Sequence, residues 1–142
     1  MPDMTMDEAI QAATQLDASL DGPGLYPELE KAIRAFEADG YPIESIIPRE
    51  DTRLGFALKS ADGRTFFQIY AKLIRKSLCS PQGEFNKLIQ SGLSKAGAGA
   101  VLTAIVTALG IPTVALAVIV PVAVIIARTG LDAFCEINSE TE

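Results

Sequence analysis

Histidine and tryptophan are absent from this 142-residue chain, and the absence of histidine narrows its possible functions. Without histidine the protein has no histidine metal site and no Ser-His or Cys-His catalytic pair. The two cysteines, Cys79 and Cys135, lie far apart and fit no metal-binding spacing. Gly97 and Gly99 follow no predicted strand and lack the third glycine of a dinucleotide-binding loop. We therefore expect neither an enzyme nor a protein that holds a cofactor or a metal.

The N-terminal sequence indicates where the protein is made, and the site of synthesis indicates the redox state of its cysteines. The N-terminal sequence MPDMTMDEAI is acidic and resembles neither a signal peptide nor a transit peptide. We expect synthesis in the cytoplasm, where thiols are kept reduced. Cys79 and Cys135 are accordingly expected to be reduced and mostly buried, and a disulfide between them stays an open alternative.

Charge is distributed unevenly along the chain. The net charge is -6, which argues against general binding of nucleic acids because that requires a basic surface. Acidic residues outnumber basic ones in residues 1–64, whereas basic residues outnumber acidic ones in residues 65–95. This basic flank is either a solvated rim or a contact with an anionic membrane surface. Its members are Lys72, Arg75, Lys76, Lys87 and Lys95.

Two amphipathic helices are predicted in the N-terminal part of the chain. Thr5 and Glu8 have the spacing of a capping box and precede apolar residues at helical spacing, which predicts a helix over about 6–20. Pro27 suits the first position of a second helix over about 27–39, because its missing N–H would have no partner there.

A β-hairpin is predicted to follow these helices. Residues 53–59, RLGFALK, alternate between apolar and polar side chains, as a half-buried strand does. Asp62 and Gly63 form a dipeptide typical of a hairpin turn, and residues 65–71, TFFQIYA, supply the partner strand. Residues 72–78, KLIRKSL, either extend this strand or begin a helix.

The stretch from Ala96 to Ala127 contains no charged residue. A glycine and a proline split it into two predicted helical arms, about 82–109 and 112–134. The predicted hairpin turn between the arms consists of Gly110, Ile111 and Pro112. Small residues recur at every fourth position of the first arm and form a ridge that would let a second helix approach closely. This ridge consists of Gly92, Ala96, Ala100, Ala104 and Ala108.

The apolar stretch is either a membrane-inserting element or a buried core. Pro121 costs about 3 kcal/mol inside a helix in water but is better tolerated in a membrane. Each uncharged arm is shorter than the ~20 residues that a spanning helix needs. Three arrangements therefore stay open. The arms could form two spans that include flanking residues, or one kinked span over about 106–127, or a hairpin buried inside a soluble shell. The membrane-facing candidates are Val118, Ile119, Val122, Ile125 and Ile126.

Together these features predict an α+β fold with two parts. Residues 1–79 form an acidic head with two helices and a small antiparallel β-hairpin. Residues 80–142 form an apolar helical hairpin with a short acidic tail. The layout is similar in outline to pore-forming toxin domains that hide such a hairpin, an analogy of layout that transfers no residue.

The leading functional expectation is a small non-enzymatic protein that is active at a membrane or anchored in it. Its C-terminal helices would insert or form homo-oligomers, and its head would sense a signal or bind an unknown protein partner. Such a protein becomes membrane-associated after synthesis in the cytoplasm. The alternative is a soluble cytoplasmic interaction module in which the apolar hairpin is the core or the interface between copies.

Overall fold

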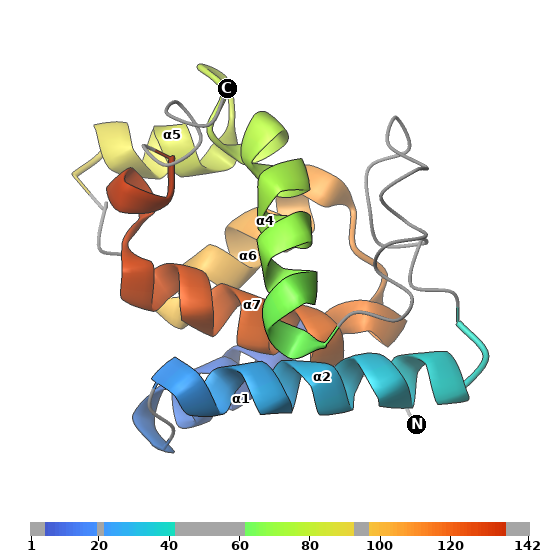
Figure 1. Ribbon diagram of the computed structural model, residues 1–142. Coiled ribbons are helices and arrows are strands. Elements are labelled where there is room, and N and C mark those ends of the chain that lie inside the picture. The colour runs from blue at the N-terminus through green and yellow to red at the C-terminus, as the bar shows by residue number, and fades with distance from the viewer. Residues whose placement is uncertain (1–4, 20–21, 42–61, 93–96, 136–142) are drawn as a thin grey trace.

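The computed structural model describes residues 5–19, 22–41, 62–92 and 97–135, and every regular element within these ranges is helical (Figure 1). The predicted α+β fold is therefore wrong for this part of the chain, which folds as an assembly of helices. The elements are α1 (Met6–Ser19), α2 (Gly22–Ala38), α4 (Gly63–Leu78), α5 (Glu84–Gln90), α6 (Ala98–Leu109), the short 3-10 helix η2 (Thr113–Ala115) and α7 (Leu116–Thr129).

Helix α7 occupies the centre of the fold. It packs against α6, its partner in the apolar hairpin, and against α1 and α2 from the N-terminal part of the chain. Helix α4 crosses α2 and runs in front of α7 in Figure 1, and α5 covers one end of α6. Residues on both sides of the predicted boundary at residue 79 belong to one continuous hydrophobic cluster.

Helix α1 confirms the predicted capping box. The backbone N–H of Glu8 donates to the Thr5 hydroxyl at 3.1 Å, and the backbone N–H of Thr5 donates to the Glu8 carboxylate at 2.9 Å. Two N–H groups that have no partner inside the helix are thereby satisfied. The helix buries Ala9 and Ala13, whose small side chains allow close packing on its neighbours.

Helix α2 begins at Gly22, earlier than predicted, and Pro27 lies inside it. Pro23 falls in the first turn, so Pro23 and not Pro27 is the proline at which a missing N–H costs no helical hydrogen bond. The helix ends where predicted, because Gly40 adopts a left-handed backbone with φ of 93°. Its inward stripe consists of Leu25, Leu29, Ile33 and Phe36.

The predicted second strand of the hairpin is in fact the first half of α4. Asp62 caps this helix, since its carboxylate accepts a hydrogen bond from the Thr65 N–H at 2.8 Å. This hydrogen bond holds the pKa of Asp62 below its ordinary value. An Asp-Gly pair serves a hairpin turn and a helix start equally well, so the dipeptide alone does not separate the two structures. The predicted first strand, residues 53–59, lies outside the described residues.

The missed signal for α4 is a run of large apolar side chains at every fourth position. Phe66, Tyr70, Ile74 and Leu78 are all fully buried along one face of the helix. Phe66 extends the helical pattern of residues 70–78 back into the predicted strand, and its ring stacks on that of Tyr70 at 5.3 Å. Burial also raises the pKa of the Tyr70 hydroxyl above its ordinary value.

Gly63 allows α4 and α2 to come unusually close. A Cβ atom at Gly63 would lie 2.0 Å from the backbone carbonyl oxygen of Tyr26, which cannot move without shifting α2. We expect Gly63→Ala to lower the free energy of unfolding by about 1–3 kcal/mol, the usual cost of overpacking. Gly97→Ala is the matched control, because a Cβ there meets nothing within 4 Å. Urea denaturation of both variants checks this; equal stabilities would contradict the close approach.

The two predicted arms are each interrupted by a glycine. Gly92, with φ of 83°, follows α5 and separates it from α6, so the first arm is two helices instead of one. Gly130, with φ of 94°, ends α7, and the chain is helical again over residues 131–135. Gly110 ends α6 in a left-handed conformation, and η2 begins directly after Pro112.

Candidate functional site: the buried apolar hairpin and its clasp

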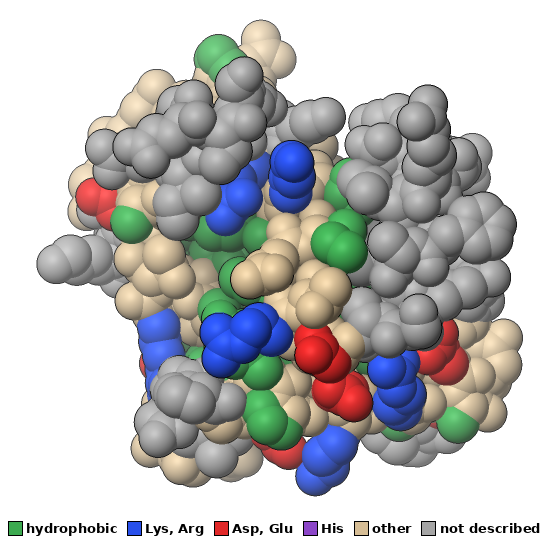
Figure 2. All heavy atoms as spheres, in the orientation of Figure 1, with side chains coloured by type: hydrophobic (Ala, Val, Ile, Leu, Met, Phe, Trp, Pro, Cys, Tyr) green, Lys and Arg blue, Asp and Glu red, His purple; other side chains and the backbone are tan. Residues whose placement is uncertain are grey.

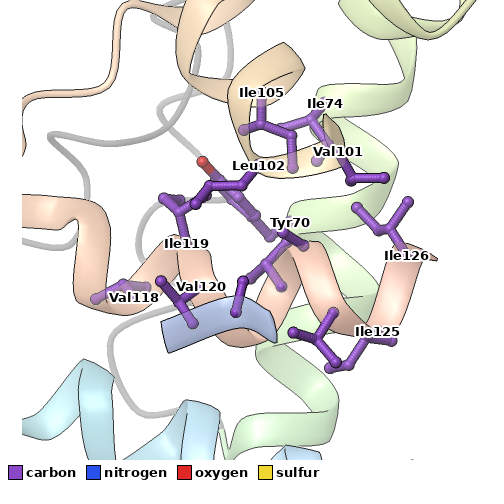
Figure 3. Packing of buried hydrophobic residues seen from close by; sticks show 14 of the residues in the cluster. Tyr70, Ile74, Val101, Leu102, Ile105, Val118, Ile119, Val120, Ile125 and Ile126 are labelled. Atoms are coloured by element: carbon purple, nitrogen blue, oxygen red, sulfur yellow. The ribbon is translucent and has the colours of Figure 1, made fainter. Parts of the chain in front are cut away.

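Helix α6 of the apolar hairpin has an exposed face that includes Ala100 and Ala108, whereas α7 is covered along almost its whole length. Ten of its residues are buried, and they form an unbroken run from Val118 to Ile126 together with Leu116. Figure 3 shows Tyr70 of α4 pointing in among Leu102 of α6 and Ile119 of α7. Among the described residues no charged residue is buried. The five membrane-facing candidates, Val118, Ile119, Val122, Ile125 and Ile126, are all core residues here.

The members of the predicted small-residue ridge do not share one environment. Ala104 is buried, whereas Gly92, Ala100 and Ala108 are exposed, and Ala96 lies outside the described residues. The buried face of α6 consists mainly of Val101, Leu102 and Ile105. A close contact is made instead at Gly99, where an added Cβ would come within 3.0 Å of the Ile10 side chain of α1.

The hairpin is short relative to a bilayer. Helices α6 and α7 contain 12 and 14 residues, so they extend about 18 and 21 Å, below the ~30 Å of a hydrocarbon core. In the part of the chain that the structure describes, no helix combines the length and the apolar character needed to cross a membrane.

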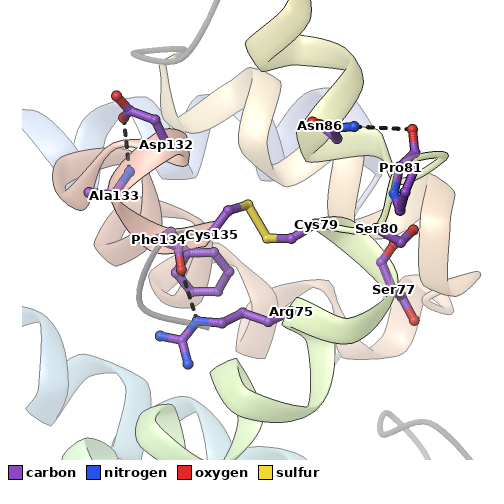
Figure 4. Close-up of a disulfide and its surroundings, with 10 residues drawn as sticks. All are labelled: Arg75, Ser77, Cys79, Ser80, Pro81, Asn86, Asp132, Ala133, Phe134 and Cys135. Atoms are coloured by element: carbon purple, nitrogen blue, oxygen red, sulfur yellow. Dashed lines mark hydrogen bonds between the residues drawn. A yellow bond between two sulfur atoms is a disulfide. The ribbon is translucent and has the colours of Figure 1, made fainter. Parts of the chain in front are cut away.

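A disulfide joins Cys79, directly after α4, to Cys135 in the helical turn that follows α7 (Figure 4). The expectation of two reduced thiols is therefore not met in this structure. The bond closes a loop with a sequence separation of 56 residues, and that loop contains α5, α6 and α7. Both cysteines are partly exposed. The entire apolar hairpin thus lies within one covalently closed loop.

Arg75 and Phe134 form a second link beside the disulfide. The guanidinium of Arg75 lies 4.4 Å from the centroid of the Phe134 ring, and its Nε donates to the Phe134 carbonyl at 3.0 Å. The Phe134 ring also packs edge-on against Phe85 of α5 at 5.7 Å. Partial burial lowers the pKa of Arg75 from its ordinary value, but such a guanidinium stays charged at neutral pH. We use the name clasp for the cluster of Arg75, Cys79, Phe134 and Cys135.

An ion pair ties the C-terminal end of α7 to α1. The Nε of Arg128 donates to the Asp17 carboxylate at 2.8 Å, and the same guanidinium donates to the Asp17 backbone carbonyl. Both side chains are partly exposed, so the net contribution to stability is modest.

The predicted basic flank is divided among different environments. Lys72 is exposed on α4, Arg75 belongs to the clasp, and Lys87 pairs with Glu84 at 3.4 Å. The side chain of Lys76 and the whole of Lys95 lie outside what the structure describes. Figure 2 shows basic side chains over α4 and alternating acidic and basic side chains along α2.

An apolar groove lies between α1, α2 and the start of α7. Its volume is about 360 Å³, and its lining contains mainly alanine, valine, leucine and aromatic side chains. Sequence reasoning did not find this groove, because its walls come from three segments that are far apart in the chain. The sequence left a disulfide between Cys79 and Cys135 as an open alternative, because their positions at the two edges of the apolar region do not by themselves bring them together.

In the part of the chain that the structure describes, the arrangement offers packing and covalent closure. Within the described ranges, no group of three or more His, Cys, Asp or Glu residues is placed to hold a metal ion. The chain matches no protein-family model, no curated protein and no solved structure.

Proposed function

We propose that this protein stores an apolar helical hairpin inside a shell of amphipathic helices and delivers it to a lipid bilayer when the clasp opens. The supporting observation is the burial of α7 by helices from both halves of the chain. A helix that is hydrophobic on all sides is stable either in a protein core or in a membrane. The same side chains therefore suit both the stored and the inserted state.

The clasp provides the means of control in this proposal. With the disulfide intact, the segment that follows α7 stays tethered beside the end of α4, which restricts how far α7 can move out of the shell. A dithiol reductant cleaves the bond by exchange, which leaves two protein thiols and an oxidised reductant. After reduction the closed loop opens, and the Arg75–Phe134 and Arg128–Asp17 contacts are the remaining polar links described above.

The short helices shape the inserted state. Because neither α6 nor α7 spans a bilayer at its present length, the hairpin enters with local thinning of the bilayer or with helix extension into neighbouring residues. Ala100 and Ala108 of the ridge are exposed in the folded protein. In the bilayer they can form contacts between copies, since small side chains let membrane helices approach closely.

Vesicle flotation tests the proposal. The full chain, with the disulfide intact or reduced by a dithiol, is mixed with phosphatidylcholine–phosphatidylglycerol vesicles, and both bound protein and dye release are measured. We expect the reduced protein to float with the vesicles and to release dye, and the oxidised protein to remain mostly unbound. The variant Cys79→Ser/Cys135→Ser should bind with or without reductant.

A failure of all three forms to bind vesicles would contradict the proposal. The alternative function, a soluble interaction module with the hairpin as its core, would then be favoured. The continuous hydrophobic cluster that includes residues on both sides of residue 79 supports this alternative. Equal binding by the oxidised and reduced protein would keep membrane delivery but would remove the disulfide as its control.

A further inference from the structure

Helix α4 carries positive charge on a chain whose net charge is -6. The helix contains no acidic residue, and its basic residues are Arg64, Lys72, Arg75 and Lys76. Figure 2 shows basic side chains over this helix, whereas acidic and basic side chains alternate along α2. The solvent-facing side of α4 therefore presents positive charge.

The outward positions of α4 form a single stripe. Arg64, Gln68 and Lys72 are exposed at intervals of four residues, and the partly buried Arg75 follows three positions later. Residues three and four apart are neighbours on a helix surface, so these side chains share one side of the helix. At 1.5 Å per residue the stripe is about 16 Å long. We use the name α4 stripe for Arg64, Gln68, Lys72 and Arg75.

The cations of the α4 stripe are not neutralised by ion pairs with the described residues. The described ion pairs use the basic residues Lys31, Arg34, Lys87 and Arg128. Arg75 binds a backbone carbonyl instead, and the Arg64 guanidinium lies 4.4 Å from the centroid of the Tyr26 ring. Asp62 is close enough to Arg64 to interact with it electrostatically. The positive charge is therefore least compensated around Lys72.

The net negative charge of the chain does not prevent contact between α4 and an anionic surface. At physiological ionic strength, exposed charges more than about 8 Å apart are largely screened from each other. A folded chain of this length has a radius of gyration of roughly 14 Å. An anionic surface beside α4 therefore interacts mainly with the α4 stripe and only weakly with acidic residues elsewhere on the molecule.

The α4 stripe ends at the clasp, which indicates what kind of surface binds it. Arg75 belongs to both, and Cys79 follows the last residue of α4. A surface that contacts the stripe lies beside the disulfide whose opening releases the hairpin in the proposed function. This continuity favours a bilayer over an acidic protein. A nucleic acid is disfavoured because its binding requires a more extensive basic surface.

We infer that the α4 stripe docks the protein on an anionic lipid bilayer before the hairpin is released. Each Lys or Arg near an anionic leaflet raises affinity roughly fivefold, so the three cations give weak and reversible contact. The inference rests on the proposed function for its occupant, the bilayer. Docking itself requires neither reduction of the disulfide nor insertion of the hairpin.

Paramagnetic NMR on the oxidised full chain tests docking in the absence of insertion. Nanodiscs of phosphatidylcholine, with or without phosphatidylglycerol, carry a nitroxide-labelled lipid, and the broadening of backbone amide signals is measured. We expect the discs with phosphatidylglycerol to broaden signals most strongly over residues 64–75, and about 1 M salt to remove the effect. Discs without it should broaden these signals no more than those of other exposed helices. Flotation does not retain such weak contact, because the protein dissociates during the separation.

A matched pair of glutamine substitutions tests the α4 stripe itself. Gln68→Lys adds a cation in the middle of the stripe and should raise the affinity for the anionic discs roughly fivefold. Gln15→Lys makes the same change at an exposed position of α1 and should leave the affinity nearly unchanged. Reversing the charge at the exposed Lys72, in Lys72→Glu, should lower the affinity at least about tenfold.

Equal effects of the two glutamine substitutions, or equal broadening by the two kinds of disc, would overturn docking through the α4 stripe. An absence of broadening with both discs would also overturn it and would favour an acidic protein as the partner. Broadening over α4 without dye release by the reduced protein would support docking and contradict the proposed function. The two proposals can therefore fail separately.

Discussion

Replacing Val122 with lysine is expected to unfold the protein in water. Val122 is fully buried in the middle of α7, and no charged side chain among the described residues is buried with it. An ammonium group placed there loses its hydration and finds no partner, at a cost of several kcal/mol. That cost is comparable to the total stability of a small domain, about 5–15 kcal/mol. Circular dichroism and urea denaturation measure the loss.

Ala108→Lys is the control for this substitution. Ala108 is exposed on α6, so a lysine there stays in water and should change the free energy of unfolding by no more than about 0.5 kcal/mol. A Val122→Lys variant as stable as Ala108→Lys would show that α7 is not the core of the folded protein.

Loss of the disulfide is expected to have the second large effect. The bond between Cys79 and Cys135 closes a loop with a sequence separation of 56 residues. In the chain-entropy description, opening such a loop lowers the free energy of unfolding by about 4 kcal/mol, because the unfolded chain gains conformations. Chemical denaturation with and without a dithiol reductant measures this difference directly.

The serine variant shows whether the effect of the reductant belongs to the disulfide. Cys79→Ser/Cys135→Ser should resemble the reduced wild type, and reductant should not change its stability further. If the oxidised wild type and the variant had the same free energy of unfolding, the disulfide would not restrict the unfolded chain. An effect of reductant on the variant would assign that effect to another cause.

The sequence predicted helices well where their end signals were local. Thr5 and Glu8 marked the start of α1 through a pair of hydrogen bonds that needs only neighbouring residues. Gly40 marked the end of α2 for the same reason, because its left-handed backbone is a property of that one residue. The apolar character of residues 96–127 was also evident from the sequence.

The errors arose where one local signal fits two structures. Asp62 and Gly63 suggested a turn, and only the four-residue spacing that begins at Phe66 distinguishes the helix from the strand. Gly92 was assigned to a helical ridge because small residues recurred around it, although its left-handed backbone separates α5 from α6.

The candidate site was less predictable than the helices, because it depends on contacts between distant segments. The sequence contains Arg75, Cys79, Phe134 and Cys135, but nothing in their spacing brings them together. Their proximity follows from the packing of α4 beside the turn after α7, which buries Phe134 against Phe85. The groove likewise exists only once α7 lies against α1 and α2.

The most direct test of storage and delivery is the environment of a fluorescent probe on α6. A nitrobenzoxadiazole group is attached to Ala108→Cys in the Cys79→Ser/Cys135→Ser background, and nitroxide-labelled lipids serve as quenchers. Ala108 is exposed in the folded protein, so the probe should be in water without vesicles. With vesicles we expect bright emission that the lipid nitroxides quench, whereas the same probe on Lys31→Cys in α2 should stay in water. Emission at position 108 that vesicles leave unchanged would contradict delivery of the hairpin to the bilayer.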